Sequence, residues 1–206
     1  MRMAQALEAG DLDEARRLAP TLVGRDPSAL DEAELCRAVV ESVAENTNDA
    51  VVAPLLWSAV FGAAGAAGYR AANTLDAMVG NKSDRYRDFG WFSARLDDVA
   101  SFVPARVTAM LVIALAPAGT RREAWHAAWR DGAAHPSPNA GRVEGAFAGA
   151  LGVTLGGLNR YPYGAERRPT LGEGRVPEVD DIGRAVTLSR LVGVAALGLA
   201  LAVARR

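Results

Sequence analysis

The feature that most constrains the fold is a run of residues, 50–69, without a single charged side chain. An α-helix rises about 1.5 Å per residue, so about twenty apolar residues cross the hydrocarbon core of a bilayer. Pro54 lies inside the run, and Gly62, Gly65 and Gly68 follow at intervals of three residues. Because proline and glycine together can break a helix, the run is expected to form either one straight span or a hairpin of two short helices.

Three further apolar segments follow, at residues 99–118, 145–158 and 185–204. The second of these is short and would span only a thin bilayer or a tilted path. Arg106 interrupts the first, and a guanidinium deep in lipid costs several kcal/mol, so we expect this side chain near an interface or facing a polar site. Basic residues occur in every loop, so the positive-inside rule assigns no orientation.

The two ends of the chain have a different character. Residues 1–48 are amphipathic: apolar residues near helical spacing predict a helix over 4–22, and Ser28 or Asp31 is expected to cap a second helix. Residues 159–181 are rich in proline and glycine, which predicts a loop containing a small turn or ribbon.

These patterns predict an all-α, polytopic integral membrane protein, formed as a single membrane-embedded domain over residues 1–206. It would have amphipathic N-terminal helices and a Pro/Gly-rich C-terminal loop. Membrane lipid is therefore an expected partner, and the expected location is the cell (cytoplasmic) membrane, crossed several times.

Composition removes several function classes. The net charge of −1 and the pI near 6.2 leave no basic field for nucleic acid. A single cysteine, Cys36, excludes an internal disulfide, and no Cys/His spacing is typical of structural zinc. The mean hydropathy of +0.05 is low for a membrane protein, so a soluble all-α interaction module stays open as an alternative, which partition between membrane and cytosol would test.

Two polar clusters flank the run 50–69. Upstream, Glu41, Glu45 and Asn48 share one helical face at i, i+4 and i+7. Downstream, residues 73–98 mix carboxylates, cations and amides between two apolar segments. Such oxygen-rich groups suit Mg²⁺, or the positioning of amines and phosphates, better than zinc.

Six stretches of the sequence together resemble one known family, and several long motifs in the same order are a specific signal. The stretches are Glu41-Ser-Val-Ala-Glu-Asn46, Asn73-Thr-Leu-Asp-Ala-Met-Val-Gly80, Arg85-Tyr-Arg-Asp-Phe-Gly-Trp91, Ala94-Arg-Leu-Asp-Asp98, Pro104-Ala-Arg106 and Ser137-Pro-Asn-Ala-Gly141. On these residues the chain resembles the adenosylcobinamide-phosphate synthases of vitamin B12 assembly, the CobD/CbiB type. The resemblance runs from about residue 24 to 157 and weakly onward. Members usually carry further apolar helices before the equivalent of Met1, so the chain is expected to be shorter than a complete member.

The resemblance implies a carbon–nitrogen (acid–amine) ligase of cobalamin biosynthesis. Its corrinoid substrate, adenosylcobyric acid, would be joined by an amide bond to (R)-1-amino-2-propanol phosphate or a related amino alcohol, giving adenosylcobinamide phosphate. ATP and Mg²⁺ are the implied cofactors, with ATP activating the carboxylate. A homo-oligomer or association with other cobalamin-assembly enzymes is compatible with this role. The alternative is a non-catalytic membrane subunit or a transporter-like component that handles corrinoids.

The same resemblance, combined with residue chemistry, selects candidate site residues. The catalytic candidates are carboxylates, two of which, Asp97 and Asp98, are also the candidate metal ligands: Glu45, Asp76, Asp97 and Asp98. The substrate-binding candidates are polar or charged: Glu41, Asn46, Asp49, Asn73, Lys82, Arg85, Arg87, Arg95 and Asn139.

Each candidate has a plainer interpretation. Asp97 and Asp98 could instead cap the helix that follows, and residues 85–88 could form a surface ion-pair network of little energetic weight. His126 and His135 are interpreted as surface or packing residues. Because one reaction should use both polar clusters, we favour the hairpin for residues 50–69, which would bring the clusters to the same membrane face.

Overall fold

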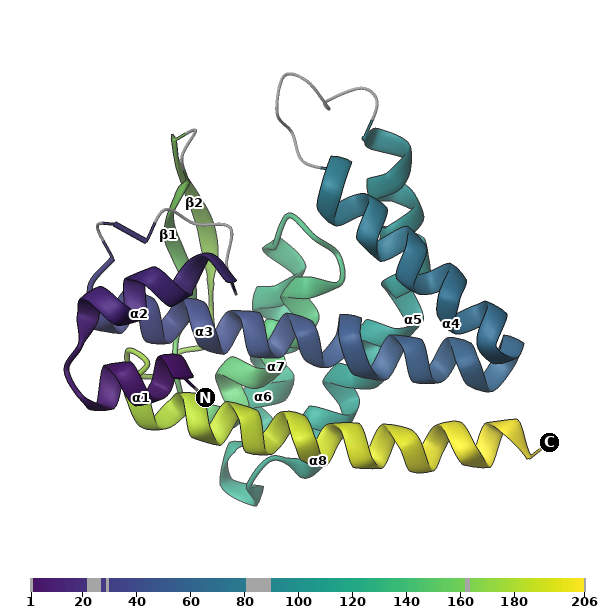
Figure 1. Ribbon diagram of the computed structural model, residues 1–206. Coiled ribbons are helices and arrows are strands. Elements are labelled where there is room, and N and C mark those ends of the chain that lie inside the picture. Colours follow the sequence, from purple (N-terminus) through teal and green to yellow (C-terminus); the bar gives the residue numbers. More distant parts are fainter. Residues whose placement is uncertain (1, 22–26, 29, 81–89, 162–163, 206) are drawn as a thin grey trace.

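The computed structural model describes residues 2–21, 27–28, 30–80, 90–161 and 164–205, and it is mostly helical (Figure 1). Three helical stretches are long and apolar enough to cross a membrane: Glu32–Val79, Trp91–Leu115 and Val179–Ala204. The predicted all-α membrane fold is thereby confirmed.

The N-terminal segment forms two short helices, α1 (Arg2–Glu8) and α2 (Leu12–Leu18). The prediction of one helix over 4–22 is wrong, because Gly10 adopts a left-handed φ of 71° that ends α1. Asp11 then caps α2 by accepting a hydrogen bond from Glu14 N at 2.9 Å. The Gly-Asp pair is thus a helix stop followed at once by a helix start.

Helix α3 (Glu32–Asn46) begins at Asp31, as predicted. The Asp31 side chain accepts from Glu34 N, and the Glu34 side chain accepts from Asp31 N, which completes a capping box. A π-helical turn, Thr47–Val52, joins α3 to α4 (Ala53–Val79). Such turns are frequent at functional sites, and this one carries the polar residues that follow α3.

Helix α4 reverses direction at Gly62, where φ is 64° and ψ is −153°. This region of backbone conformation is open essentially only to glycine. The first half of α4 continues the line of α3, and the second half returns beside α5 (Figure 1). The predicted hairpin for residues 50–69 is confirmed, and the straight span is wrong.

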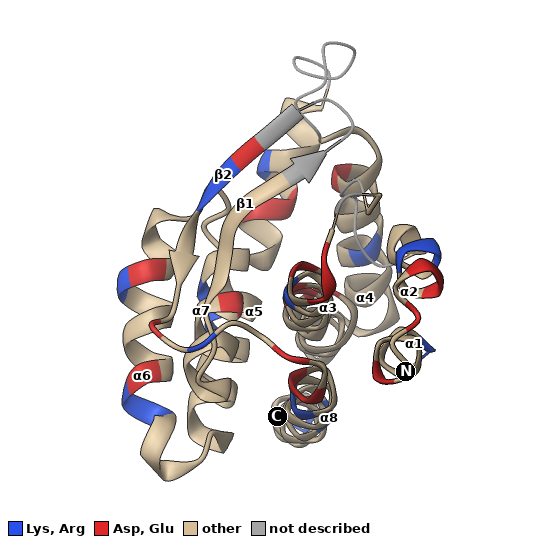
Figure 2. Ribbon diagram, turned by 90° about the vertical axis from the view of Figure 1, so that its left-hand side faces the viewer, with Lys and Arg blue, Asp and Glu red and all other residues tan. Residues whose placement is uncertain are grey.

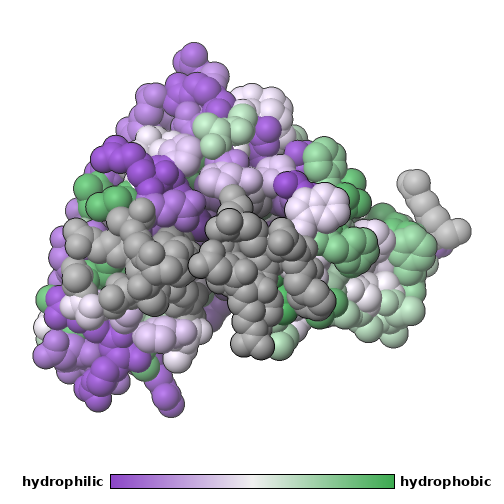
Figure 3. Space-filling model, turned by 90° about the horizontal axis from the view of Figure 1, so that it is seen from above, coloured by the Kyte–Doolittle hydropathy of each residue, from purple (hydrophilic) through white to green (hydrophobic). Residues whose placement is uncertain are grey.

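Helices α4, α5 (Trp91–Leu115) and α8 (Val179–Ala204) present apolar side chains outward. Val60, Val99 and Val194 are 62%, 75% and 72% exposed. Figure 3 shows apolar side chains gathered at the end of the molecule that holds α4 and the C-terminal half of α8, and hydrophilic ones at the opposite end. An exposed apolar surface on helices of this length is what a bilayer covers.

Helix α7 (Ala140–Leu151) lies in the interior, between α5 and α6 (Arg121–His126). Glycines permit its close approach to the α6 side: a Cβ on Gly145 would lie 2.4 Å from the carbonyl oxygen of Ala127. Viewed along α3 and α8, α6 and α7 lie on one side of α3, and α1 and α2 on the other (Figure 2).

The predicted apolar segment 145–158 is not one element. The left-handed Gly152, with φ of 70°, ends α7, and the chain enters β1 (Leu155–Tyr161), which pairs antiparallel with β2 (Gly164–Leu171). The ribbon predicted within the C-terminal loop is thus a hairpin that begins earlier than expected. Because α7 is short and buried on nearly every side, it is a core helix and is not among the three candidate spans.

Candidate functional site

The α4 hairpin brings the two polar clusters together. Asn73, in the returning half of α4, donates from Nδ2 to Asp49 Oδ2 at 3.4 Å and to Asp97 Oδ1 at 3.2 Å. The Tyr69 hydroxyl donates to Asp49 Oδ1 at 3.4 Å. Side chains of the π-helical turn, α4 and α5 are therefore joined at one place, as expected if both clusters serve one site.

A cavity of about 40 Å³, which we call the polar cavity, opens beside these residues. Its lining is mostly polar: Glu45, Asn48, Asp49, Asp97, Ser101, Ser137, Asn139, Ala140 and Val143. A single water needs at least about 10–15 Å³, so the cavity accommodates a small polar group and excludes a nucleotide or a corrin ring. Its three carboxylates favour a cationic guest.

Asn139 lines the polar cavity, and Arg106 contacts Asn139 without lining the cavity itself. Asn139 Nδ2 donates to the Asp98 carbonyl oxygen at 2.8 Å, and Arg106 Nη1 donates to Asn139 Oδ1 at 3.2 Å. These bonds fix the orientation of the Asn139 amide and tie α7 to α5. Arg106 was expected near an interface or facing a polar site, and its guanidinium contacts a residue that lines the polar cavity.

A second group of acids lies behind Glu45, and we call Glu41, Glu45 and Glu144 the glutamate cluster. The carboxyl groups of Glu45 and Glu144 hydrogen-bond to each other, which requires one shared proton. Glu41 Oε1 accepts from Gly156 N at 2.7 Å, so the start of β1 closes this cluster. Burial raises the pKa of Glu144 well above its ordinary value, and the nearby Glu45 and Glu41 add to the rise.

Three side chains of the glutamate cluster and its surroundings hold polar atoms without a hydrogen-bond partner among the described residues. They are Glu144 Oε1, both amide atoms of Asn159 and His135 Nε2, in residues only 2%, 1% and 8% exposed. The register of the hairpin places Asn159 and Arg168 on the same face of the ribbon, and the Arg168 charge acts on both Glu144 and His135. Burial lowers the pKa of His135, which favours the neutral ring.

Several predicted residues lie apart from the polar cavity. The Asp98 carboxylate pairs with Arg95 at 3.0 Å, and the Asn46 amide donates to Ser42 O within its own helix. The Asp76 carboxylate packs over Gly80 at the end of α4. The candidates Lys82, Arg85 and Arg87, and with them the alternative of an ion-pair network at 85–88, lie outside the described residues.

The alternative that Asp97 and Asp98 cap the helix that follows is wrong, because both residues lie within α5, well after its start at Trp91. Their carboxylates also diverge, Asp97 toward Asn73 and Asp98 toward Arg95. Among the described residues no three Asp, Glu, His or Cys side chains are arranged to hold a metal ion. The fit of Mg²⁺ to this pair is therefore poor, and no chemical step is assigned to a protein-bound metal.

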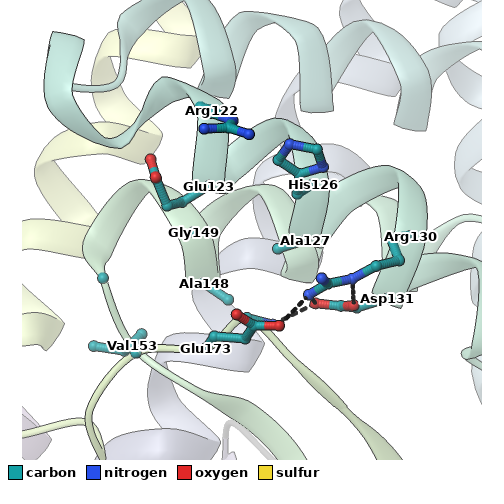
Figure 4. Close-up of a pocket in the computed structure, with 13 residues that line it drawn as sticks. Arg122, Glu123, His126, Ala127, Arg130, Asp131, Ala148, Gly149, Val153 and Glu173 are labelled. Atoms are coloured by element: carbon teal, nitrogen blue, oxygen red, sulfur yellow. Dashed lines mark hydrogen bonds and ion pairs between the residues drawn. The ribbon is translucent and has the colours of Figure 1, made fainter.

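A larger hollow, of about 390 Å³, lies between α6, α7 and the end of β2 (Figure 4). It contains none of the predicted site residues. Its most prominent cation, Arg130, is already paired with Asp131 at 2.6 Å and Glu173 at 2.7 Å. Volume does not select this hollow, because a larger one of about 570 Å³ lies between α5, α7 and α8. The predicted carboxylates Glu45, Asp49 and Asp97 instead line the polar cavity.

The individual candidate residues do not include Glu144, Asn159 and His135, although the stretch 137–144 was expected to contribute to the site. Glu144 carried a usable signal, since a single acid among small and apolar residues is rarely buried without a function. No sequence signal marked Asn159, because its position depends on the packing of β1 against α3, more than a hundred residues earlier in the chain.

Comparison with known proteins agrees with these features. The family described as CobD/Cbib protein matches residues 1–189. A relative from Mycobacterium tuberculosis (strain H37Rv) is 55% identical over 209 residues, covering 100% of this chain and 67% of the relative. A relative from Geobacter metallireducens is 53% identical over 174 residues (84% and 55% covered), and one from Rhodobacter capsulatus is 46% identical over 189 residues (91% and 60% covered). Each of the three is named a cobalamin biosynthesis protein CobD. No solved structure matches the chain.

Proposed function

Because the chain belongs to the CobD/CbiB family, we propose that it takes part in cobalamin biosynthesis and there forms an amide bond. The bond would join a carboxylate of adenosylcobyric acid to (R)-1-amino-2-propanol phosphate or a related amino alcohol, with ATP as the activating co-substrate. The family match and the printed names of the relatives support the pathway. The chain spans about two thirds of the M. tuberculosis relative and less of the other two, so the reaction itself is our inference.

One observation favours amide formation over other steps: the polar cavity is small, acidic and built from four elements, namely α3, the π-helical turn, α5 and the start of α7. A carboxylate does not react with an amine at neutral pH unless it is first activated. Transfer of a phosphoryl group from ATP would give an acyl phosphate, whose carbonyl carbon the amine attacks while phosphate leaves. The amine must first lose a proton, and Glu45, Asp49 and Asp97 are carboxylates at the cavity that can hold an ammonium and accept that proton.

The remaining parts of the substrates would lie outside the polar cavity, which is too small for them. Asn139 lines the cavity and accepts a hydrogen bond from Arg106, so an amide and a guanidinium lie at its edge, where they can orient a carbonyl or phosphate oxygen. The predicted phosphate-binding cations Lys82, Arg85 and Arg87 come between α4 and α5 in the chain, the two helices that supply Asn73 and Asp97. Proximity in sequence supports a shared role for them.

The test is product formation by membranes that contain this chain. Adenosylcobyric acid, aminopropanol phosphate, ATP and Mg²⁺ are supplied, and adenosylcobinamide phosphate is measured by mass spectrometry. We expect product that depends on both ATP and the amine and is lost in Asp97→Asn. The M. tuberculosis relative, expressed in the same way, is the positive control. Product from that relative but none from correctly inserted chain would refute the proposal, and corrinoid uptake without product would favour the transporter-like alternative.

A further inference from the structure

Resting on this proposed function, we infer that the polar cavity and the glutamate cluster form the subsite for the primary ammonium group of the amino alcohol. Within it Glu45 contacts the ammonium, and the Glu45–Glu144 pair receives the proton that the amine must lose. Glu144 acts through Glu45 and is a positioning residue.

The excess of carboxylates around this subsite favours a cationic guest. The titratable and charged groups that face the subsite come from every element packed around it: Glu41 and Glu45 of α3, Asp49 of the π-helical turn, Tyr69, Arg70 and Asp76 of α4, Asp97, Asp98 and Arg106 of α5, His135 of the loop before α7, Glu144 of α7, and Glu166 and Arg168 of β2. Even with one proton shared between Glu45 and Glu144, the carboxylates outnumber the three arginines. An ammonium is a compact charge with several N–H donors and suits such a site.

Unpaired buried groups indicate that the described protein residues alone do not complete the interior of the subsite behind Glu45. Leaving a buried donor or acceptor without a partner costs about 1–3 kcal/mol for each group. Glu144 Oε1, the Asn159 amide and His135 Nε2 lie in residues at least nine-tenths buried and have no partner among the described residues. A native interior keeps such groups where a ligand or an ordered water completes them.

Access to the glutamate cluster is through Glu45. Its carboxyl group lines the polar cavity on one side and hydrogen-bonds to Glu144 on the other. A guest of one small polar group therefore reaches Glu45 without opening the interior. Glu144 then lies one contact further from the substrate.

The proton balance is simple. The Glu45–Glu144 pair starts with one proton and one negative charge, takes a proton from the ammonium, and becomes neutral with two protons. The free amine then attacks the acyl phosphate: a C–N bond forms, the C–O bond to phosphate breaks, and the second amine proton leaves with the phosphate. Nothing is oxidised or reduced, and the pair returns its proton to water after the product departs.

The test measures binding in detergent, separately from turnover. The probes are 1-amino-2-propanol, the matching 1,2-propanediol, and tetramethylammonium, which carries the charge but no N–H donor. We expect the melting temperature of the wild-type chain to rise with the amino alcohol only. Glu45→Gln should weaken this effect at least about tenfold in probe concentration, as the loss of a charge-assisted hydrogen bond predicts. Glu123→Gln, an exposed glutamate of α6, is the matched control and should bind as the wild type does.

Turnover supplies the readout specific to Glu144. Glu144→Gln should change the pH dependence of kcat while the KM for the amino alcohol changes less than about threefold, because Glu144 does not touch the substrate. Equal stabilisation by the diol or by tetramethylammonium, unchanged binding by Glu45→Gln, or an unchanged pH profile in Glu144→Gln would overturn the inference. Selective amine binding without product would instead refute the proposed reaction and leave the ammonium subsite standing.

Discussion

The polar cavity and the glutamate cluster are adjacent, yet they are stabilised in different ways. In the polar cavity the side chains bond to one another: Asn73 bridges Asp49 and Asp97, and Asn139 is held from both sides. In the glutamate cluster and beside it, Glu144 Oε1, the Asn159 amide and His135 Nε2 have no hydrogen-bond partner among the described residues. The first region is ordered by bonds within the protein, whereas in our proposal the second is completed by protons and a guest.

The largest effect should come from removing a charge of the polar cavity. Asp97→Asn eliminates a carboxylate that lines the cavity, and we expect turnover to fall by about 100-fold or more, as for loss of an acid–base group. Asp98→Asn, one residue along, removes only an exposed pair with Arg95 and leaves the backbone carbonyl that Asn139 contacts. We expect a change below about fivefold, measured by the same product assay. Equal losses in both variants would show that the cavity does not define the site.

The next effect tests the hairpin that assembles the polar cavity. Gly62→Ala places a side chain on a residue with φ of 64° and ψ of −153°, and we expect a loss of about 1–3 kcal/mol in the free energy of unfolding. Gly68→Ala lies in the regular part of the returning helix and should be neutral or stabilising by up to about 1 kcal/mol. Neither residue has a neighbour within 4 Å of an added Cβ, so the pair isolates backbone conformation from steric clash. Thermal unfolding in detergent measures both.

Features that depend on residues close together in the sequence could be predicted, and features that depend on contacts between distant residues could not. The three long apolar helices, the Asp31 cap and the hairpin at residues 50–69 depend on local signals or on glycine and proline, and these predictions are confirmed. The break at Gly10 was missed although its signal is local, because apolar spacing on either side continued the helical pattern. The glutamate cluster depends on α3, α7 and a ribbon that meet only in the folded chain, so residue spacing could not reveal it.

The glutamate cluster should also make the free energy of unfolding depend on pH. Because the pKa of Glu144 is raised in the folded protein, folding favours the proton-bound form, and this contribution is fully present below the ordinary glutamate pKa of about 4.3. It is lost as the pH rises through the raised value, so the free energy of unfolding should fall with increasing pH. Glu144→Gln cannot titrate and should flatten this slope, raising stability near neutral pH.

The measurement is chemical or thermal unfolding of wild type and Glu144→Gln across pH 4 to 8, a series that starts near the ordinary glutamate pKa of about 4.3 and extends above it. Glu123→Gln is the control for the loss of a carboxylate from an exposed place, and it should keep the wild-type slope. A slope that is unchanged by Glu144→Gln would mean that the glutamate cluster is as well satisfied as the polar cavity, and the contrast between the two regions would disappear.

The smallest expected effect comes from removing one buried hydrogen bond beside the polar cavity. Thr108 donates from its buried hydroxyl to Asn48 Oδ1 at 3.0 Å, and Asn48 Nδ2 in turn donates to Asp49 Oδ1 at 2.8 Å. Thr108→Val keeps the shape and removes one donor, so we expect a loss of about 1 kcal/mol in unfolding free energy and a modest fall in turnover. Thr187→Val, at an exposed position of α8, should change stability by less than about 0.5 kcal/mol. This chain of hydrogen bonds ends on Asp49. If Thr108→Val lowers turnover by a larger factor than its loss of stability accounts for, hydrogen bonds within the protein orient the carboxylates of the polar cavity. If Thr108→Val and Thr187→Val respond equally, the polar cavity is no better ordered than the glutamate cluster behind it.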